Sequence, residues 1–372
     1  MKITKTINKK KKKVMMIVPH LRTGGGQKLV LDIISNMDHK VLDILVISLY
    51  PSEGNIFETF AVEKGINVKY LNKKEGMDIS VIKQIKGIIS SFRPEIIHAH
   101  LTVMPYILLP LIMSGVKKRF YTVHNLAERD ASHHKYMKMI LKFSFKYANV
   151  IPIAISETCK QSIISYYNLP EDKIPCIYNG IDTNKFKCII PYEQRKSESL
   201  TFIATGRMEP QKNYELMLRA FAEVHQTYPN TKLVVLGDGY LRKELENEID
   251  RLNISEAVVL KGRVSNVEEE LNKAHIYLMS SNWEGLPLSL MEAMSCGLPV
   301  IATKAGGVLD IVREHENGYL INLNDKESFV KAMIELIQQP ELRKRYSTAS
   351  LRESKTYDIK ICAKRHLELY LK

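Results

Sequence analysis

Two glutamates eight positions apart, Glu284 and Glu292, are the most informative pair of residues in the sequence. Glu284 precedes a Gly-Leu-Pro segment, and Glu292 falls in a run of Leu, Met and Ala that favours a helix. Carboxylates accept hydrogen bonds from sugar hydroxyls, whereas glycine backbone and a helix N-terminus favour phosphate. The pattern therefore indicates a ligand with both hydroxyls and phosphates, such as a nucleotide-sugar.

Two cations, Arg207 and Lys212, follow a predicted strand on a loop that leads into a helix at Asn213. A guanidinium fork and an ammonium group can together neutralise a diphosphate without a metal ion. Two surface cations on a loop are usually only solvated. Arg207 and Lys212, however, lie beside a predicted crevice and the Glu284/Glu292 pair, which favours a role in ligand binding.

The sequence predicts neither a metal ion nor any other cofactor. Asp-x-Asp, the usual metal–diphosphate handle of other transferases, is absent from the chain. His98 and His100 alternate at the end of one predicted strand, and His124 ends another. A metal site would need a third ligand that converges with such a pair, and the sequence indicates none. A lone histidine is more often a satisfied core residue.

Three consecutive glycines, Gly24, Gly25 and Gly26, separate the first predicted strand from a helix. Their amides can approach an anion at the N-terminus of that helix. The spacing differs from G-x-G-x-x-G and from a Walker loop, so a plain tight turn remains an alternative. The absence of the dinucleotide-binding motif G-x-G-x-x-G also argues against an NAD-dependent oxidoreductase.

Short apolar runs alternate with helical patterns along the chain, which is typical of parallel α/β domains. In the first half, strands are predicted at 14–19, 43–49, 67–71, 95–99, 119–124, 151–155 and 173–177. The pattern restarts in the second half at 200–205, 232–236, 258–261, 275–279, 299–302 and 319–321. A polar stretch between them, 182–199, is predicted to be a linker. One helix is expected at 79–92, capped by Asp78.

With 372 residues, 45% of them apolar, the chain is typical of a soluble protein of two domains. The five cysteines are scattered, which fits a reducing cytosol and argues against a disulfide framework or a zinc site. The apolar runs are too short for a signal peptide or a membrane span, so we expect a cytoplasmic protein.

The net charge of +13 is unevenly distributed, since residues 1–190 hold 29 Lys and Arg against 15 Asp and Glu. This excess is either a solubility feature or an attraction to an anionic membrane or a lipid diphosphate. A predicted helix at 132–147 places lysines three or four residues apart, with Met137, Ile140, Leu141 and Phe145 supplying apolar surface. It is a candidate for peripheral membrane contact or an ordinary surface helix. No nucleic-acid partner is expected.

In their order along the chain, these motifs resemble glycosyltransferase family 4, the retaining enzymes with the two-domain GT-B fold. The resemblance covers nearly the whole chain, and the Glu, seven residues, Glu spacing is its most specific part. It rests on Gly24–26, 178–182, Gly206-Arg207 with Lys212, 235–239 and 284–302. One departure is Gln27, where members of the family commonly have glutamate.

The resemblance implies an α/β fold of two Rossmann-like, doubly wound domains that face a central cleft. Residues 1–185 would bind the acceptor, completed by a C-terminal helix at 357–372, and residues 198–356 would bind the donor.

The family also implies residue roles. The catalytic residues would be His124, Glu284, Arg207 and Lys212. His124 would touch the transferred sugar from the first domain, Glu292 would bind the ribose, and the base would lie near Val264. The donor-binding residues would be Gly25, Gly26, Arg207, Lys212, Val264, Glu284, Gly285, Leu286, Leu288 and Glu292.

The expected activity is retaining, metal-independent transfer of a sugar, most simply from a UDP-sugar, to a lipid-linked or growing glycan in capsule or exopolysaccharide synthesis. The enzyme would work in the cytoplasm, in peripheral contact with the inner face of an anionic membrane as a further hypothesis. The alternatives are a soluble transferase or synthase with a free sugar or small acceptor, and a catalytically silent nucleotide-sugar-binding protein.

Overall fold

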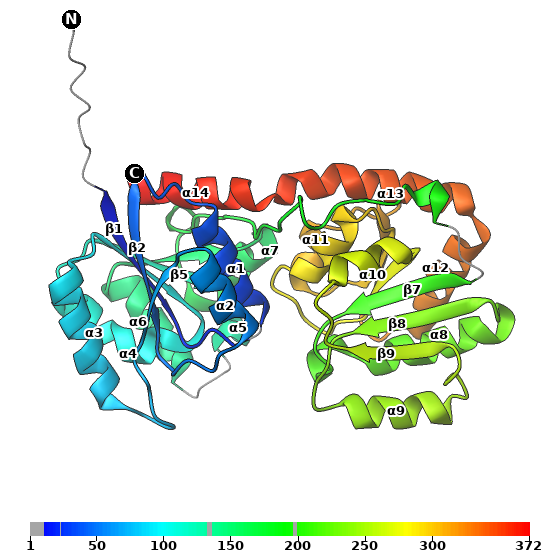
Figure 1. Cartoon of the computed structure of the whole chain (residues 1–372), viewed down its shortest axis with the longest axis horizontal. Coiled ribbons are helices and arrows are strands. Elements are labelled where there is room, and N and C mark those ends of the chain that lie inside the picture. The colour runs from blue at the N-terminus through cyan, green and yellow to red at the C-terminus, as the bar shows by residue number, and fades with distance from the viewer. Residues whose placement is uncertain (1–10, 23, 132–135, 196–198) are drawn as a thin grey trace, which may run out of the picture. The chain divides into compact units, whose positions relative to one another are not determined.

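A computed structural model describes residues 11–22, 24–131, 136–195 and 199–372. The chain divides into two compact units, residues 1–180 with 359–372, and residues 181–358. In the described part of the chain, each unit contains one parallel sheet of six strands with helices on its faces (Figure 1). The structure is therefore an α/β protein of two doubly wound, Rossmann-like halves.

The first sheet has the strand order β3-β2-β1-β4-β5-β6. Its strands are β1 (Lys12–Val18), β2 (Leu42–Ser48), β3 (Asn67–Tyr70), β4 (Ile96–His100), β5 (Lys118–Val123) and β6 (Val150–Ala154). Its helices are α1 (Gly25–Ser35), α2 (Ile56–Glu63), α3 (Ile79–Phe92), α4 (Met104–Met113), α5 (Ala127–Asp130), α6 (Met137–Tyr147), α7 (Glu157–Tyr167) and α14 (Ile359–Leu371).

The second sheet has the order β12-β11-β10-β7-β8-β9. Its strands are β7 (Leu200–Thr205), β8 (Thr231–Leu236), β9 (Val258–Gly262), β10 (Ile276–Met279), β11 (Val300–Thr303) and β12 (Gly318–Ile321). Its helices are α8 (Tyr214–Thr227), α9 (Arg242–Arg251), α10 (Val267–Lys273), α11 (Leu288–Ser295), α12 (Lys326–Gln338) and α13 (Pro340–Ser354).

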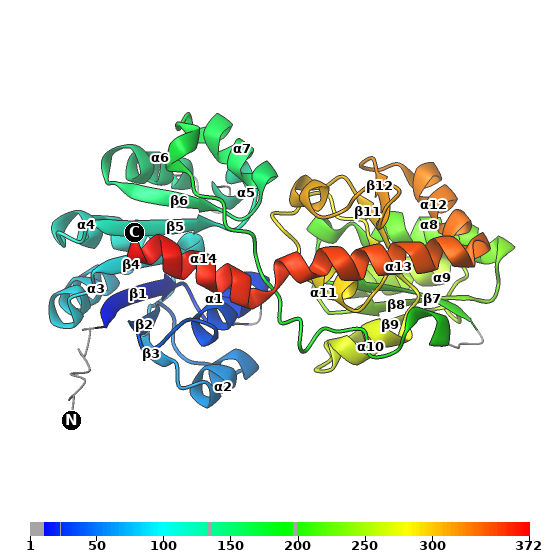
Figure 2. The same ribbon diagram turned by 90° about the horizontal axis from the view of Figure 1, so that it is seen from above.

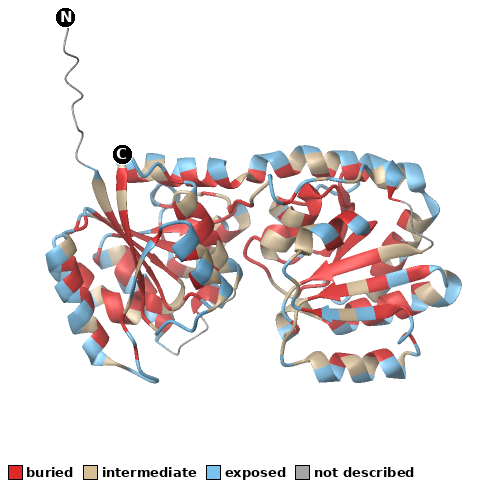
Figure 3. Ribbon diagram, viewed as in Figure 1, coloured by how far each residue is buried: buried red, intermediate tan, exposed pale blue. Residues whose placement is uncertain are grey.

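The central strands are largely apolar, as expected for parallel strands with helices on both faces of the sheet. Val14, Met15, Met16, Ile17 and Val18 of β1 are all buried, and Figure 3 shows the same burial along the central strands of both sheets.

Helix α3 illustrates how local sequence sets the elements. It occupies the predicted residues, Ile79–Phe92, and the Asp78 side chain accepts a hydrogen bond from the Ser80 amide at its N-terminus. Val81, Ile85 and Ile88 recur at helical spacing and form its buried side. Thus the capping residue and the apolar period together determine both the limits and the orientation of this helix.

Two predictions about the chain between the sheets are wrong. Residues 173–177 do not form a strand, because Pro175 interrupts the run and only Cys176 bridges to Ala154. The described part of 182–199 is not a free linker. It belongs to the second unit, where Arg195 is buried and donates a hydrogen bond to the Ala274 carbonyl at 2.8 Å.

Helix α14 belongs to the first unit, where it contacts α1 (Figure 2). Its Tyr370 hydroxyl forms a hydrogen bond of 2.5 Å with Nδ1 of His98. The His366 ring stacks on His98 with 5.7 Å between the ring centroids. Burial lowers the pKa of both histidines, to about 4 for His366. The C-terminal helix is therefore held by imidazoles that are neutral at pH 7.

This burial predicts acid sensitivity. The unfolded chain binds histidine protons below pH 6.5, whereas the fold resists them down to about pH 4, so stability falls as the pH falls through this window. Replacing His366 with Leu should reduce the slope of unfolding free energy against pH, between pH 6.5 and 5, by up to about 1.4 kcal/mol per pH unit. Urea unfolding at several pH values measures this slope.

His315→Leu is the matched control, because the His315 side chain is 70% exposed and should leave the slope unchanged. Burial raises the pKa of Asp130 to about 7, which acts in the opposite direction. That contribution is common to all three proteins and cancels in the comparison. An unchanged slope in His366→Leu would contradict the role assigned to His366.

Candidate functional site

The topology of the second sheet brings the predicted cations and carboxylate together. Strands β7 and β10 are neighbours, but the chain proceeds from them toward opposite edges of the sheet. In open parallel sheets, ligands bind at the carboxyl ends of the strands where the order reverses in this way. The loop after β7 carries Arg207 and Lys212, and the loop after β10 carries Glu284.

At this point a buried ion pair joins the two loops. Lys212 Nζ donates to Glu284 Oε1 at 2.6 Å, and the side chains are only 17% and 7% exposed. The hydroxyl of Ser281 donates to the same oxygen at 2.7 Å, and the Gln211 amide to Oε2 at 3.3 Å. A buried carboxylate is costly unless it is paired and hydrogen-bonded, and here it receives three donors.

The backbone beneath Glu284 is packed too closely for any residue but glycine. Gly306, in the loop after β11, has φ of 57°, and a Cβ atom there would lie 2.1 Å from the Glu284 carbonyl oxygen. The Gly307 amide donates to that oxygen at 3.3 Å. The sequence analysis missed Gly306, Gln211 and Ser281. The pair of glycines after a predicted strand was the available signal for the first of these.

Arg207 takes a different position from Lys212. Its side chain is 63% exposed and pairs with Glu209 at 2.9 Å. The loop that carries it rests directly on the next one, since a Cβ atom at Gly237 would lie 2.0 Å from the Gly206 carbonyl oxygen. The backbone at Arg207 is thus held firmly, while its guanidinium is accessible to an anion.

The rest of the predicted donor set lies around the start of α11. Gly285 and Leu286 are buried between Glu284 and the helix, and Leu288 is its first residue. Glu292 is half-buried within it. Burial, together with the charges of Glu292 and Glu284, raises the pKa of Tyr277, so both carboxylates are near this one strand residue.

Val264 is half-buried and follows β9, which is separated from β10 by β7 and β8.

The first unit has its own group of predicted residues at the corresponding edge. Strands β1, β4 and β5 are neighbours, so the glycine turn after β1 meets His100 and His124. A Cβ atom on Gly26 would lie 3.7 Å from His124 Nδ1. His124 Nε2 lies 3.1 Å from His100 Nδ1, and burial followed by the influence of His366 lowers the pKa of His124 to about 4. Its ring is therefore neutral at pH 7.

Two further residues complete this edge. Gly25 begins helix α1, which has no side-chain cap at its N-terminus. Gln27, the departure from the family pattern, is buried, and its side-chain amide lies 3.3 Å from His20 Nδ1. An uncharged side chain therefore occupies the turn beside the glycines.

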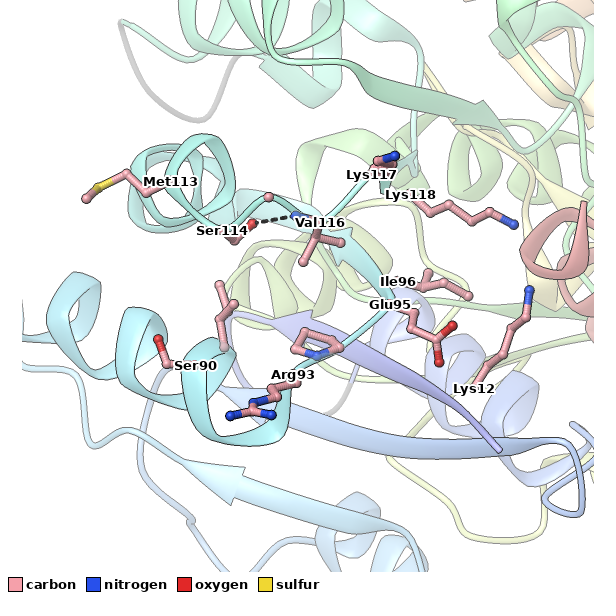
Figure 4. A pocket seen from close by; sticks show the side chains of 13 residues that line it. Lys12, Ser90, Arg93, Glu95, Ile96, Met113, Ser114, Val116, Lys117 and Lys118 are labelled. Atoms are coloured by element: carbon pink, nitrogen blue, oxygen red, sulfur yellow. Dashed lines mark hydrogen bonds between the residues drawn. The ribbon is translucent and has the colours of Figure 1, made fainter. Parts of the chain in front are cut away.

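A cavity of about 550 Å³ in the first unit is not part of this group. It is lined by Lys12, Ile96 and Lys118, at the amino ends of β1, β4 and β5 (Figure 4). It therefore opens at the edge of the sheet opposite to Gly26 and His124.

The close packing at Gly306 can be tested by substitution. Gly306→Ala should lower the free energy of unfolding by at least about 1–3 kcal/mol, because the left-handed backbone and the Glu284 carbonyl both oppose a Cβ atom. The control is Gly87→Ala within α3, where a Cβ atom meets nothing within 4 Å. It should stabilise by roughly 0.5–1 kcal/mol. Urea denaturation compares them, and equal stabilities would refute the packing argument.

Comparisons with known proteins agree with this architecture. Residues 23–185 match the model of "Glycosyltransferase Family 4", and residues 189–352 match that of "Glycosyl transferases group 1". An uncharacterised glycosyltransferase of Methanocaldococcus jannaschii is 30% identical over 322 residues, which are 74% of this chain and 79% of the relative.

One further relative and one solved structure are informative. The UDP-Gal:alpha-D-GlcNAc-diphosphoundecaprenol alpha-1,3-galactosyltransferase of Escherichia coli is 28% identical over 278 residues, 69% of this chain and 71% of that protein. The Anabaena protein HepE, solved in complex with UDP, has a TM-score of 0.80 at 19% identity, covering 96% of this chain and 99% of its own. The chain belongs to glycosyltransferase family 4, the group 1 glycosyl transferases, and has the GT-B fold.

Proposed function

We propose that this protein transfers a sugar, with retention of anomeric configuration, from a UDP-sugar to a lipid-linked or growing glycan in surface polysaccharide synthesis, such as capsule or exopolysaccharide. The second unit would bind the donor and the first the acceptor. The observation that carries the proposal is the buried Glu284 carboxylate, held by Lys212 beside the exposed Arg207. The undecaprenol-linked acceptor and UDP donor in the name of the Escherichia coli relative support the substrate classes.

In the donor site, Arg207 and Lys212 would neutralise the diphosphate. The exposed guanidinium of Arg207 is free of bulky cover and only has to exchange Glu209 for phosphate oxygens. The α11 N-terminus adds the partial positive charge of its unpaired amides, near Leu288. Glu292 would accept hydrogen bonds from the ribose, and Glu284 from the transferred sugar.

In the reaction, the bond between the anomeric carbon and the diphosphate oxygen would break, and its electron pair would leave with UDP. The acceptor hydroxyl would attack the same face of the sugar and pass its proton to the departing diphosphate. Preorganised cations that stabilise developing charge are usually a large part of such catalysis. With Arg207 and Lys212 in this role, no metal ion is required. The roles implied for His124, Gly25 and Gly26 stay predictions.

A lipid-linked acceptor places the reaction at the inner face of a cell membrane, so the enzyme would work in the cytoplasm as a peripheral protein. The described part of the chain contains no helix long and apolar enough to cross a bilayer.

Donor binding can be tested by thermal unfolding in excess EDTA with UDP, GDP, ADP or NAD. UDP at about 100 times its dissociation constant should stabilise the protein by roughly 2.7 kcal/mol, visible as a rise of some degrees in Tm. Arg207→Ala should lose this shift. Arg352→Ala, another exposed arginine paired with a glutamate, should keep it. A shift with NAD alone, or with none of the four, would overturn the proposal.

The role of Glu284 can be separated from donor affinity. Glu284→Gln retains the shape of the side chain but weakens its hydrogen bonds to the sugar. We expect kcat to fall by about 10- to 150-fold, since a hydrogen bond to a charged group contributes about 1.5–3 kcal/mol. The UDP-induced shift in Tm should persist. NMR of the product anomer reports retention or inversion, and an inverted product would contradict the proposed mechanism.

A further inference from the structure

Three helices of the first unit form a surface with an unusual charge. Helices α3, α4 and α6 are adjacent, since α4 contacts both of the others. The strand order places them on one face of the sheet, opposite to α1 and α2. They contain five lysines and no Asp or Glu, the lysines being Lys83, Lys86, Lys138, Lys142 and Lys146. Helices α1, α2, α7 and α14 all contain acidic residues.

Helix α4 exposes an apolar outer side. Its residues, Met-Pro-Tyr-Ile-Leu-Leu-Pro-Leu-Ile-Met, include no charged side chain. Tyr106, Ile107 and Leu111 are buried against the sheet, whereas Leu109, Ile112 and Met113 are 54%, 47% and 57% exposed. An outer helix of a soluble domain ordinarily carries polar residues on its solvent side. This helix instead exposes apolar side chains one turn apart.

Helix α6 continues the same property, and here the structure corrects the sequence analysis. Met137, Leu141 and Phe145, expected to provide apolar surface, are buried in the core. A different set is exposed along one side of the helix, at intervals of three and four residues. Tyr136, Met139, Phe143 and Tyr147 are 61%, 65%, 44% and 73% exposed.

The aromatic rings of Phe143 and Tyr147 lie together, with 5.5 Å between their centroids. Lys142 and Lys146 lie on the same helix, between this exposed stripe and the buried side, as the helical period of 3.6 residues requires. Lys135, the fourth lysine of the predicted helix, lies outside the described residues. Helix α6 thus combines apolar, aromatic and basic residues on its solvent side.

The positive charge continues past the ends of α3 and α4. The cavity of about 550 Å³ described above is lined by Met113 of α4 and by four cations, Lys12, Arg93, Lys117 and Lys118 (Figure 4). Glu95 is its one acidic lining residue. The apolar surface of α4 therefore borders a hollow in which cations outnumber acidic residues.

We propose that the outer sides of α4 and α6 form a docking surface for an anionic lipid bilayer. The apolar and aromatic side chains would enter the headgroup–acyl boundary, and the surrounding lysines would contact anionic headgroups. A bilayer suits this surface because its basic margin has no acidic residue on the three helices to complement a second copy of the same face. The inference rests on the proposed function, since a lipid-linked acceptor requires the enzyme to reach a membrane.

Sedimentation of the full chain with vesicles tests the surface. Vesicles of phosphatidylcholine with phosphatidylglycerol should bind at least about tenfold more tightly than phosphatidylcholine alone, and high salt should reduce this difference. Met139→Glu with Phe143→Glu should weaken binding to the anionic vesicles at least about tenfold. The control pair, Ile56→Glu with Val62→Glu, alters apolar residues of α2 that are 61% and 80% exposed and should bind as the unaltered chain does.

The basic residues are tested separately. Lys142→Glu with Lys146→Glu should weaken binding to anionic vesicles only, while Lys243→Glu on α9, with its side chain 81% exposed, should have a much smaller effect. Equal losses in test and control variants would overturn the docking surface, as would equal binding to neutral and anionic vesicles. A dimer in solution that Met139→Glu with Phe143→Glu dissolves, without vesicle binding, would instead assign the surface to a second copy.

The UDP-induced rise in Tm is measured on the same variants. It should be unchanged in all of them, which shows that each is folded and binds the donor. Loss of vesicle binding with the UDP shift retained supports the docking surface. Absence of vesicle binding in the unaltered chain, with the UDP shift present, overturns the docking surface but not the transferase. Absence of the UDP shift overturns the proposed function itself.

Discussion

The candidate donor site depends on the cost of burying one carboxylate. The Glu284 carboxyl group can be buried because Lys212, Ser281 and Gln211 all donate hydrogen bonds to it. These donors come from the loops after two different strands, so the pairing requires β7 and β10 to be neighbours. It also requires position 306 to be a glycine, because the loop after β11 packs there against the Glu284 carbonyl oxygen. The topology and the close backbone packing of the second unit therefore together fix the position of the Glu284 carboxyl group.

The first unit buries polar side chains that are neutral rather than charged. Its central strands bring His98, His100 and His124 together with His366 of the C-terminal helix, and burial lowers the pKa of all four. Neutral imidazoles can donate and accept hydrogen bonds at once, so they can fill a buried polar edge without needing counterions. We therefore expect the attachment of the C-terminal helix to weaken in acid. The two units thus share a topology but stabilise their polar edges by different means.

Regular elements were largely predictable because each leaves a local signal. The apolar runs located every strand of both sheets within one or two residues, and Asp78 with the apolar period located α3. The failures occurred where the local signal was ambiguous. Residues 173–177 have the apolar composition of a strand, but they include Pro175. The polar residues 182–195 have the composition of a linker, but Arg195 is buried and donates a hydrogen bond to the carbonyl of Ala274, which is distant in the sequence.

The sequence by itself determined the fold class, the order of the motifs and the chemical types available at the site, because these follow from residue identity and short-range periodicity. Only the tertiary structure decided which of those groups meet. Lys212 and Glu284 are 72 positions apart, and their contact depends on strand order, which no local pattern encodes. Tertiary structure also decided which side of α6 faces solvent. The helix has apolar residues on two sides, so its period alone could not distinguish the side that packs on the sheet.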